Sequence, residues 1–391
     1  MTITLTQEQI REEGYALLGT TFAYTQDGAL LMAASVSDGS DSGVGNMLWR
    51  SEDEGRRWAR VGFIEKSFRY DRQGSMVKMG GNAALYADAA AGVILFTGNE
   101  MFWEAGHYES TKRKSRLYYR LSFDSGRTFT DKRYVVLPGR APDAPIPGVV
   151  FGRNFALSMA SQTLRASDGA LLVALQCQMT DESGGLIEPA GFHFFQSGAL
   201  RAAWNEEKLD YDWDMGDYVR VSPEESTRGV FEPTFARLDG RRVLMVMRGS
   251  NYRRERDLIG RKFCAVSEDD GRHWSAARPL DYDDGGVMYS SSSVPKLWAH
   301  SSGRLYYIGV INERNPEGNG PRAPLCIAEI DRTRRCVIRE SVRVVDRARD
   351  GAADYTNHGV YEDSHGRIVV YAPFRGALNR YEIAVYRTGL A

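Results

Sequence analysis

The sequence has 391 residues, of which 42% are hydrophobic and 26% are charged, and its formal net charge is −1. Because charges of both signs are interspersed, the chain lacks the basic patch that marks nucleic-acid-binding proteins. No stretch approaches the roughly 18 consecutive apolar residues of a membrane-spanning helix. We therefore expect neither nucleic acid nor a membrane as a partner.

The four cysteines are scattered along the chain, at positions 177, 264, 326 and 336. Disulfide frameworks and zinc sites need clustered ligands, so we expect reduced, buried cysteines, no metal site and no cofactor. The first ten residues combine neither a basic segment nor an apolar one of the kind that directs secretion. On that basis the chain as given is expected to be cytoplasmic, and the sequence indicates no oligomeric state.

In chain order, residues Gln7 to Gly14 predict one or two helical turns, and the later elements are mostly short strands. Apolar or alternating runs at residues 117–122, 261–267 and 382–386 are typical of strands. The proline-rich stretch 138–148 predicts an irregular connection. Residues 179–218 are rich in acidic and aromatic side chains and indicate an elaborated unit or a surface insertion.

One phrase recurs six times along the chain, as a turn closed by glycine that runs into a short apolar strand. Successive glycines of this phrase are 63 to 77 residues apart. Such a long and regular period indicates a repeat architecture, and each unit is long enough for a four-stranded antiparallel sheet. We therefore predict an all-β fold, a six-bladed β-propeller whose residues 1–391 form a single domain. The glycines are Gly28, Gly92, Gly169, Gly240, Gly303 and Gly366.

A second motif, S-x-D-x-G-x-x-[W/F], follows the first in three of the six units. Its aspartate is expected to accept backbone N–H bonds, its glycine to take a positive φ, and its aromatic ring to pack into the blade. We interpret these aspartates as structural. The three copies span residues 51–58, 122–129 and 267–274.

This motif is the Asp-box, and three copies in phase with a six-fold repeat resemble the sialidase (neuraminidase) superfamily over essentially the whole chain. The resemblance implies an exo-acting glycoside hydrolase. Its site would lie on the propeller axis, with a tyrosine nucleophile, a glutamate partner, an aspartate acid/base and three arginines that clamp a substrate carboxylate. A neutral nucleophile avoids repulsion by that carboxylate, and the planar arginine fork binds the carboxylate bidentately.

Two stretches of the second half are similar to the family's site phrases. Phe231-Glu232-Pro233, followed after a strand by Arg248, implies that Glu232 is the partner of the tyrosine and that Arg248 is a clamp arginine. Arg322, just before an apolar strand, resembles the next clamp arginine. A capping glutamate and solvated strand-end arginines are the structural alternatives.

The nucleophile and the acid/base are expected in the last and first units. Tyr355, ten residues before the last glycine phrase, resembles the catalytic tyrosine, and a cross-strand aromatic is the alternative. The loop 37–43 precedes the first Asp-box, so Asp41 is our acid/base, with Asp38 in reserve. A Gly/Ser/Asp turn without chemistry is the alternative there.

The first unit departs from the family. Where an Arg-Ile-Pro phrase is expected, the chain reads Gly19-Thr-Thr21-Phe, so the first clamp arginine is missing. A bidentate arginine–carboxylate contact contributes about 2–3 kcal/mol, so its loss weakens binding of sialic acid unless another cation, such as Arg153 or Arg69, substitutes. A related nonulosonate, a uronate and a neutral sugar stay open as the substrate.

Two other classes compete with the hydrolase. A propeller lyase would abstract the proton α to a uronate carboxylate with a histidine or tyrosine. His358, three residues after Tyr355, is a candidate base, and His107 and His193 lie in expected loops of the second and third units. A non-catalytic carbohydrate-binding propeller is the third interpretation, favoured by the missing arginine. In all three the expected partner is a carbohydrate.

Overall fold

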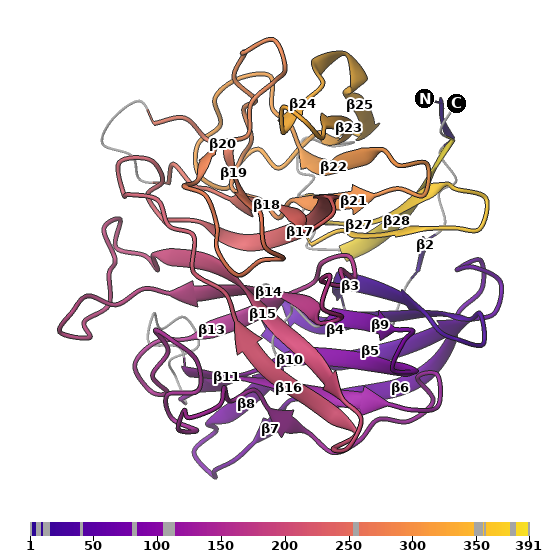
Figure 1. Cartoon of the computed structure of the whole chain (residues 1–391), viewed down its shortest axis with the longest axis vertical. Helices are drawn as coiled ribbons and strands as arrows, with labels where there is room; N and C mark the ends of the chain where they lie inside the picture. Colours follow the sequence, from indigo (N-terminus) through magenta and orange to yellow (C-terminus); the bar gives the residue numbers. More distant parts are fainter. Residues whose placement is uncertain are drawn as a thin grey trace. The chain divides into compact units, whose positions relative to one another are not determined.

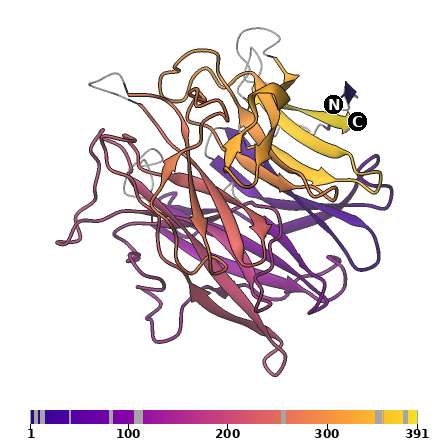
Figure 2. The same ribbon diagram turned by 45° about the horizontal axis from the view of Figure 1, so that its top comes forward.

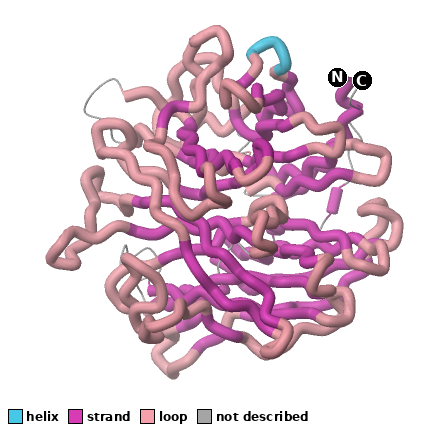
Figure 3. The backbone as a smooth tube through the Cα atoms, viewed as in Figure 1, coloured by secondary structure: helices cyan, strands magenta, loops and turns pink. Residues whose placement is uncertain are grey.

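The computed structural model describes residues 2–4, 9–10, 16–39, 42–79, 84–104, 114–252, 258–347, 355, 357–375 and 381–389. These residues form antiparallel strands joined by turns, and one short 3-10 helix, η1 (Arg339–Ser341) (Figure 3). The chain divides into two compact units. One comprises residues 12–187 and 200–215, and the other comprises residues 1–11, 188–199 and 216–391. That residues 1–391 form a single domain stays a prediction.

The unit of residues 12–187 and 200–215 contains the first two sheets. The first has the order β3-β4-β5-β6, and the second the order β12-β11-β10-β8-β7 with β9 also on β10 (Figure 1). The strands are β3 (Ala16–Tyr24), β4 (Leu30–Gly39), β5 (Ser42–Ser51), β6 (Ala59–Lys66), β7 (Phe68–Arg69), β8 (Met76–Met79), β9 (Ala84–Asp88), β10 (Val93–Trp103), β11 (Lys114–Ser122) and β12 (Arg133–Tyr134).

The third sheet has the order β13-β14-β15-β16, and the chain passes from one unit to the other within β15. The proline-rich stretch 138–148 contains no strand, as predicted, and connects β12 to this sheet. Of the predicted elaboration over residues 179–218, only residues 179–194 form an irregular excursion before β15; the rest of that stretch contains β15 and β16, two regular strands of the sheet, so the prediction is wrong there. The strands are β13 (Ala156–Met159), β14 (Leu171–Gln178), β15 (Phe195–Asn205) and β16 (Asp210–Met215).

The fourth and fifth sheets lie in the unit that contains residues 216–391. Their orders are β17-β18-β19-β20 and β21-β22-β23-β24, with β25 also on β23. The strands are β17 (Phe231–Asp239), β18 (Arg242–Arg248), β19 (Lys262–Ser267), β20 (Arg278–Pro279), β21 (Lys296–Ala299), β22 (Leu305–Val310), β23 (Leu325–Asp331), β24 (Cys336–Val337) and β25 (Arg343–Asp346).

The sixth sheet joins the two ends of the chain. Its order is β1-β28-β27-β26, with β2 also on β28, and the N- and C-termini lie beside each other (Figure 2). The predicted helix at Gln7–Gly14 is therefore wrong at Gln9–Ile10, because those two residues pair with Ala384 and Ile383 of β28. The strands are β1 (Thr2–Thr4), β2 (Gln9–Ile10), β26 (Gly359–Glu362), β27 (Ile368–Arg375) and β28 (Tyr381–Gly389).

The six glycine phrases mark equivalent turns. In every copy the glycine has a positive φ, from 39° to 90°, and the turn leads into the second long strand of its sheet: β4, β10, β14, β18, β22 or β27. Only glycine adopts such a backbone at little cost. The repeat seen in the sequence is thus a repeat of one turn.

The Asp-boxes have the predicted structural role. In each copy the aspartate Oδ1 accepts the serine hydroxyl and the backbone N–H four residues on, and the glycine N–H donates to the serine Oγ at 2.8 Å. The closing aromatic rings pack on aromatic rings of the same sheet: Trp58 on Phe22, Phe129 on Phe96 and Trp274 on Phe235.

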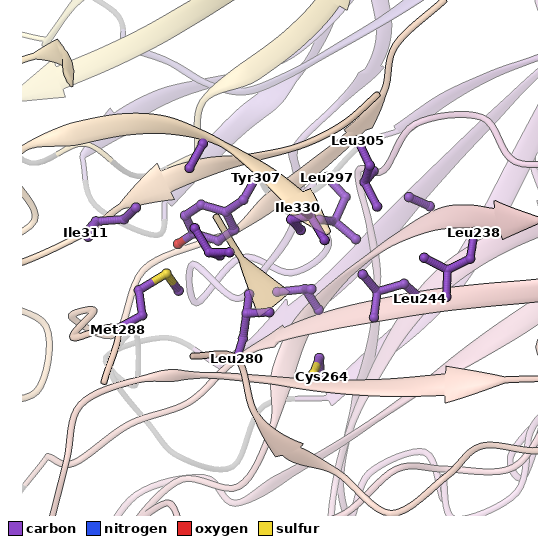
Figure 4. Packing of buried hydrophobic residues seen from close by; sticks show 14 of the residues in the cluster. Leu238, Leu244, Cys264, Leu280, Met288, Leu297, Leu305, Tyr307, Ile311 and Ile330 are labelled. Carbon is purple, nitrogen blue, oxygen red and sulfur yellow. The ribbon is translucent and has the colours of Figure 1, made fainter. Parts of the chain in front are cut away.

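Within each unit, apolar side chains fill the space between neighbouring sheets. Figure 4 shows the cluster shared by the fourth and fifth sheets, where Leu238 and Leu244 lie opposite Leu297 and Leu305. Burial of such side chains contributes about 1.5–3 kcal/mol each. All four cysteines are free and buried, as predicted. Among the described residues there is no helix with the length and apolar character needed to cross a bilayer.

Candidate active site

Glu232 lies on a β-bulge at the start of β17. Phe231 pairs with Arg248 and Thr234 with Val246. The two pairs are therefore three residues apart along β17 but only two apart along β18. Glu232 has a φ of 49°, a left-handed conformation that costs a side chain other than glycine roughly 1–2 kcal/mol. Strain of this kind persists only where the surrounding contacts hold the backbone in place, and strained residues are concentrated at functional sites.

The Glu232 carboxylate forms an ion pair with the Arg248 guanidinium, since Arg248 Nη1 lies 2.7 Å from Glu232 Oε2. The exposed fractions of the two side chains are 14% and 7%. Arg248 also donates from Nε to Ser292 Oγ at 2.8 Å and from Nη2 to Asn319 Oδ1 at 3.0 Å. A charge-assisted network of this kind fixes the orientation of the guanidinium.

Arg322 reaches the same serine, because its Nε donates to the carbonyl oxygen of Ser292 at 3.2 Å. Asn312 secures the surrounding loops: its Oδ1 accepts the N–H of Ser291, and its Nδ2 donates to the carbonyls of Pro321 and Ala323. The structure thus brings the two predicted clamp arginines to one residue, Ser292, with Glu232 bound to the first.

Tyr355 adjoins this group through its backbone, since its N–H donates to the carbonyl of Arg322 at 2.9 Å. Its side chain is only 1% exposed and belongs to the apolar cluster of the fifth and sixth sheets. The hydroxyl donates to the carbonyl of Arg347 at 3.3 Å, which is long for an O–H···O bond. The structure therefore gives the ring a packing role, and the nucleophilic role stays a prediction.

The remaining predicted residues lie elsewhere or are not described. Arg153 is exposed, in the unit of residues 12–187, and Arg69 Nη1 donates to the carbonyl of Gly74 within that unit. Asp41 lies outside the described residues, and for Asp38 only the backbone, in β4, is described. Their predicted roles stay predictions.

Thr21, where the resemblance expects an arginine, has a structural role. Its buried Oγ1 accepts the N–H of Leu85 at 3.4 Å and so joins the first sheet to the second. Thr234 accepts the N–H of Leu297 in the same way, at 3.2 Å. The threonine belongs to a link that recurs between neighbouring sheets.

Three basic residues near Glu232 were missed by sequence reasoning: Arg228, Lys262 and Lys296. Arg228 and Arg248 each stack on the Phe231 ring, with guanidinium carbons 4.9 and 4.5 Å from its centroid. Lys262 and Lys296, the first residues of β19 and β21, are 0% and 9% exposed. A basic residue that opens an apolar strand is ordinarily interpreted as solvated, so no signal in the sequence distinguished these lysines.

Burial lowers the pKa of three titratable bases in this part of the fold. It lowers that of Lys296 to about 8, opposed by the Glu232 carboxylate. It lowers the pKa of Lys262 well below its ordinary value, and the positive charge of Arg248 adds to that effect. Burial and the charge of Lys296 lower the pKa of His358 to about 3. The imidazole is therefore neutral, and its Nε2 donates to the carbonyl of Ile308 at 3.1 Å.

The chain belongs to the BNR repeat-like domain family, whose profile matches residues 68–336, more than half of the sequence. No curated protein matches the chain by sequence. Eight solved structures of the same fold have 10–14% identity to it.

Three of these structures show how much of the chain shares the fold. A Dyadobacter fermentans protein of unknown function has a TM-score of 0.65 and 13% identity, over 99% of this chain and 97% of that one. The Trypanosoma rangeli sialidase, in complex with the inhibitor DANA, has a TM-score of 0.61 and 10% identity, over 98% of this chain and 57% of that one. The NanB sialidase from Streptococcus pneumoniae has a TM-score of 0.62 and 10% identity, over 99% and 70%.

These comparisons define the class. The chain is an all-β, six-bladed β-propeller of the sialidase-like BNR type, as predicted. The chain spans little more than half the length of the Trypanosoma rangeli sialidase. Sequence identities this low show a shared fold and not a shared function.

Proposed function

We propose that this protein is a sialidase-like exo-glycoside hydrolase that removes a terminal acidic sugar from a glycan. The observation that supports the proposal is the group formed by Glu232, Arg248, Ser292 and Arg322, in which both arginines contact one serine and the first is paired with a carboxylate held in a strained conformation. Two oriented guanidinium groups suit a carboxylate ligand.

In the proposed reaction the Tyr355 oxygen attacks the anomeric carbon, and its proton passes to the Glu232 carboxylate. Asp41 protonates the leaving oxygen and then takes a proton from the water that hydrolyses the glycosyl–tyrosine bond, so the configuration is retained. The arginines offset the charge of the substrate carboxylate. Because the Tyr355 hydroxyl rests on the carbonyl of Arg347, the ring must turn toward the substrate.

Fluorogenic sialosides and uronides test the proposal. We expect release of fluorophore from one of them, retention of configuration by NMR, and loss of turnover but not of ligand binding in Tyr355→Phe. Arg322→Met and Arg248→Met should raise KM at least tenfold. Turnover by Tyr355→Phe at the wild-type rate would remove the tyrosine from the mechanism.

A carbohydrate-binding propeller without hydrolysis is the second candidate, and the burial of the Tyr355 ring favours it. Such a protein would retain a glycan on an affinity column and release nothing from any sialoside or uronide. The lyase is the weaker candidate, because the proposed base, His358, is fully buried and its Nε2 is engaged by the carbonyl of Ile308.

A further inference from the structure

The guanidinium of Arg248 has a hydrogen-bond acceptor at each of its three nitrogens. Nη1 is paired with Glu232, Nε donates to Ser292 Oγ at 2.8 Å, and Nη2 donates to Asn319 Oδ1 at 3.0 Å. Ser292 is 1% exposed and the Glu232 side chain is 14% exposed, whereas Asn319 is an exposed residue. Of these three partners, Asn319 is therefore the one that a ligand from solvent can displace without moving a buried group.

The contact of Asn319 with Arg248 is made by a neutral oxygen. An arginine side chain has donors only, so the oxygen of the amide, and not its nitrogen, faces Nη2. A carboxylate at the same place would add the attraction between opposite charges and the two parallel bonds that a guanidinium offers. The position at Nη2 is thus one that a carboxylate fills better than the amide that fills it.

Asn319 lies at the tip of a two-residue hairpin turn. Glu317 and Gly320 exchange both of their backbone N–H···O bonds, each 3.1 Å long, so only Gly318 and Asn319 form the loop. Gly318 has a φ of 54°, a conformation that glycine adopts at little cost, and a two-residue loop is a common hairpin connection. The ring of Tyr252 covers the turn, since a Cβ at Gly318 would lie 2.8 Å from Tyr252 Cδ2.

The turn is attached to the two segments that hold Arg248. The N–H of Gly318 donates to Oδ1 of the buried Asn251, three residues after Arg248, at 2.7 Å. The carbonyl of Gly318 accepts the N–H of Ser292 at 2.8 Å, and Ser292 is also the acceptor for Arg248 Nε. Backbone contacts on both sides therefore hold the exposed Asn319 side chain at the guanidinium.

We propose that Asn319 is a specificity-determining residue, whose amide oxygen holds on Arg248 the position that the carboxylate of an acidic sugar takes. When the ligand binds, the amide turns to solvent and the carboxylate oxygen accepts from Nη2. This exchange favours a carboxylate, because a charged acceptor replaces a neutral one. The hydroxyl or ester of an uncharged sugar exchanges one neutral acceptor for another and gains nothing.

This inference rests on the proposed function and sharpens it, because it assigns the carboxylate to Nη2 of Arg248 and disfavours a neutral sugar. It also differs in sign from a structural role of Asn319. If the amide only oriented the guanidinium, its removal would weaken ligand binding. If the amide competes with the ligand, its removal strengthens ligand binding.

Binding of DANA and of its methyl ester, measured by calorimetry, tests the proposal without requiring turnover. Asn319→Ala removes the competing oxygen and should tighten binding of DANA at least threefold. Asn319→Asp has the same shape but places a carboxylate on Arg248, so it should weaken binding of DANA at least tenfold and leave the ester within threefold. Binding of DANA that is unchanged or weaker in the alanine variant overturns the proposal.

Asn315→Asp is the matched control, because it adds the same charge to the same loop, away from Arg248. Asn315 Oδ1 accepts the N–H of Gly260 at 2.9 Å, and its Nδ2 donates to the carbonyl of Leu258 at 3.2 Å. This variant should bind DANA within twofold of the wild type. Equal losses in the two aspartate variants would show a general effect of charge and overturn the role of Asn319.

The wild type separates this inference from the function on which it rests. Failure of the wild type to bind DANA, glucuronate or a sialoside overturns the proposed function itself. Binding of one of these acids by the wild type, with the same affinity in Asn319→Asp, overturns the role of Asn319 alone.

Discussion

Glu232 and Gly19 occupy the same position in two β-bulges of the same form. On β3, Leu18 pairs with Ser35 and Thr21 with Ala33, and on β17, Phe231 pairs with Arg248 and Thr234 with Val246. The second residue of each bulge is left-handed, with φ of 60° at Gly19 and 49° at Glu232. Glycine fits this backbone without strain, whereas the side chain of Glu232 makes the same backbone costly.

Glu232→Gly should be more stable than Glu232→Ala by about 1 kcal/mol, because both variants lose the carboxylate and only alanine keeps the left-handed strain. Urea denaturation measures the difference. At Thr234, two residues on in regular strand, the order should reverse by about 0.5–1 kcal/mol, since glycine destabilises a strand relative to alanine. Equal stability of the two Glu232 variants would show that the bulge relaxes without cost.

The ion pair of Glu232 and Arg248 should be strongly coupled. Arg248→Met removes the guanidinium partner of a partly buried carboxylate and should cost about 3 kcal/mol, whereas the double variant with Glu232→Gln should recover about 2 kcal/mol of the summed losses. A double-mutant cycle by chemical denaturation gives the coupling. Additive losses would mean that water, and not Arg248, solvates the carboxylate.

The repeat and its turns could be predicted from the sequence because they depend on local chemistry. A glycine at each turn and a serine–aspartate pair in each box determine the backbone around themselves. Glu232, Arg248 and Arg322 were predicted by resemblance, and their convergence on Ser292 required the structure, because that serine stands in a run of four and carries no signal of its own.

Lys296 and the N-terminal strand could not be predicted for a different reason. The burial of Lys296 depends on the sheets packed on either side of its strand, and the pairing of β1 and β2 with β28 joins segments from opposite ends of the chain. Local patterns carry no information on either contact. At Gln9–Ile10 the predicted helix is replaced by this long-range pairing.

Substitutions of Tyr355 should distinguish the packing role of its ring from the chemical role of its hydroxyl. Because the ring is buried, Tyr355→Ala should cost about 3–5 kcal/mol of stability. Tyr355→Phe keeps the buried ring and loses the long bond from the hydroxyl to the carbonyl of Arg347, so it should cost about 1 kcal/mol. Thermal or urea unfolding measures both. A large loss in the phenylalanine variant would mean that the hydroxyl has a stronger partner than this carbonyl.

The Asp-box of residues 267–274 should act on stability alone. Asp269→Ala removes the acceptor of the Ser267 hydroxyl and of the His273 N–H and should cost about 1–2 kcal/mol. Asp269→Asn keeps an acceptor oxygen and should cost less. Ligand binding should be unchanged in both variants once they are folded. A loss of ligand affinity in the asparagine variant would contradict the structural role of the box.

The burial of His358 should make stability pH-dependent below neutrality. Its folded pKa, about 3, is below the ordinary value, so between pH 6.5 and 3 the unfolded chain binds a proton that the folded chain does not. Stability is therefore full above pH 6.5 and falls with pH, by about 2 kcal/mol at pH 5. His358→Gln, which keeps a donor for the carbonyl of Ile308, should remove this slope between pH 7 and 5 in urea titrations, whatever its stability at pH 7. An unchanged slope in that variant would assign the effect to another group and contradict a buried, neutral imidazole.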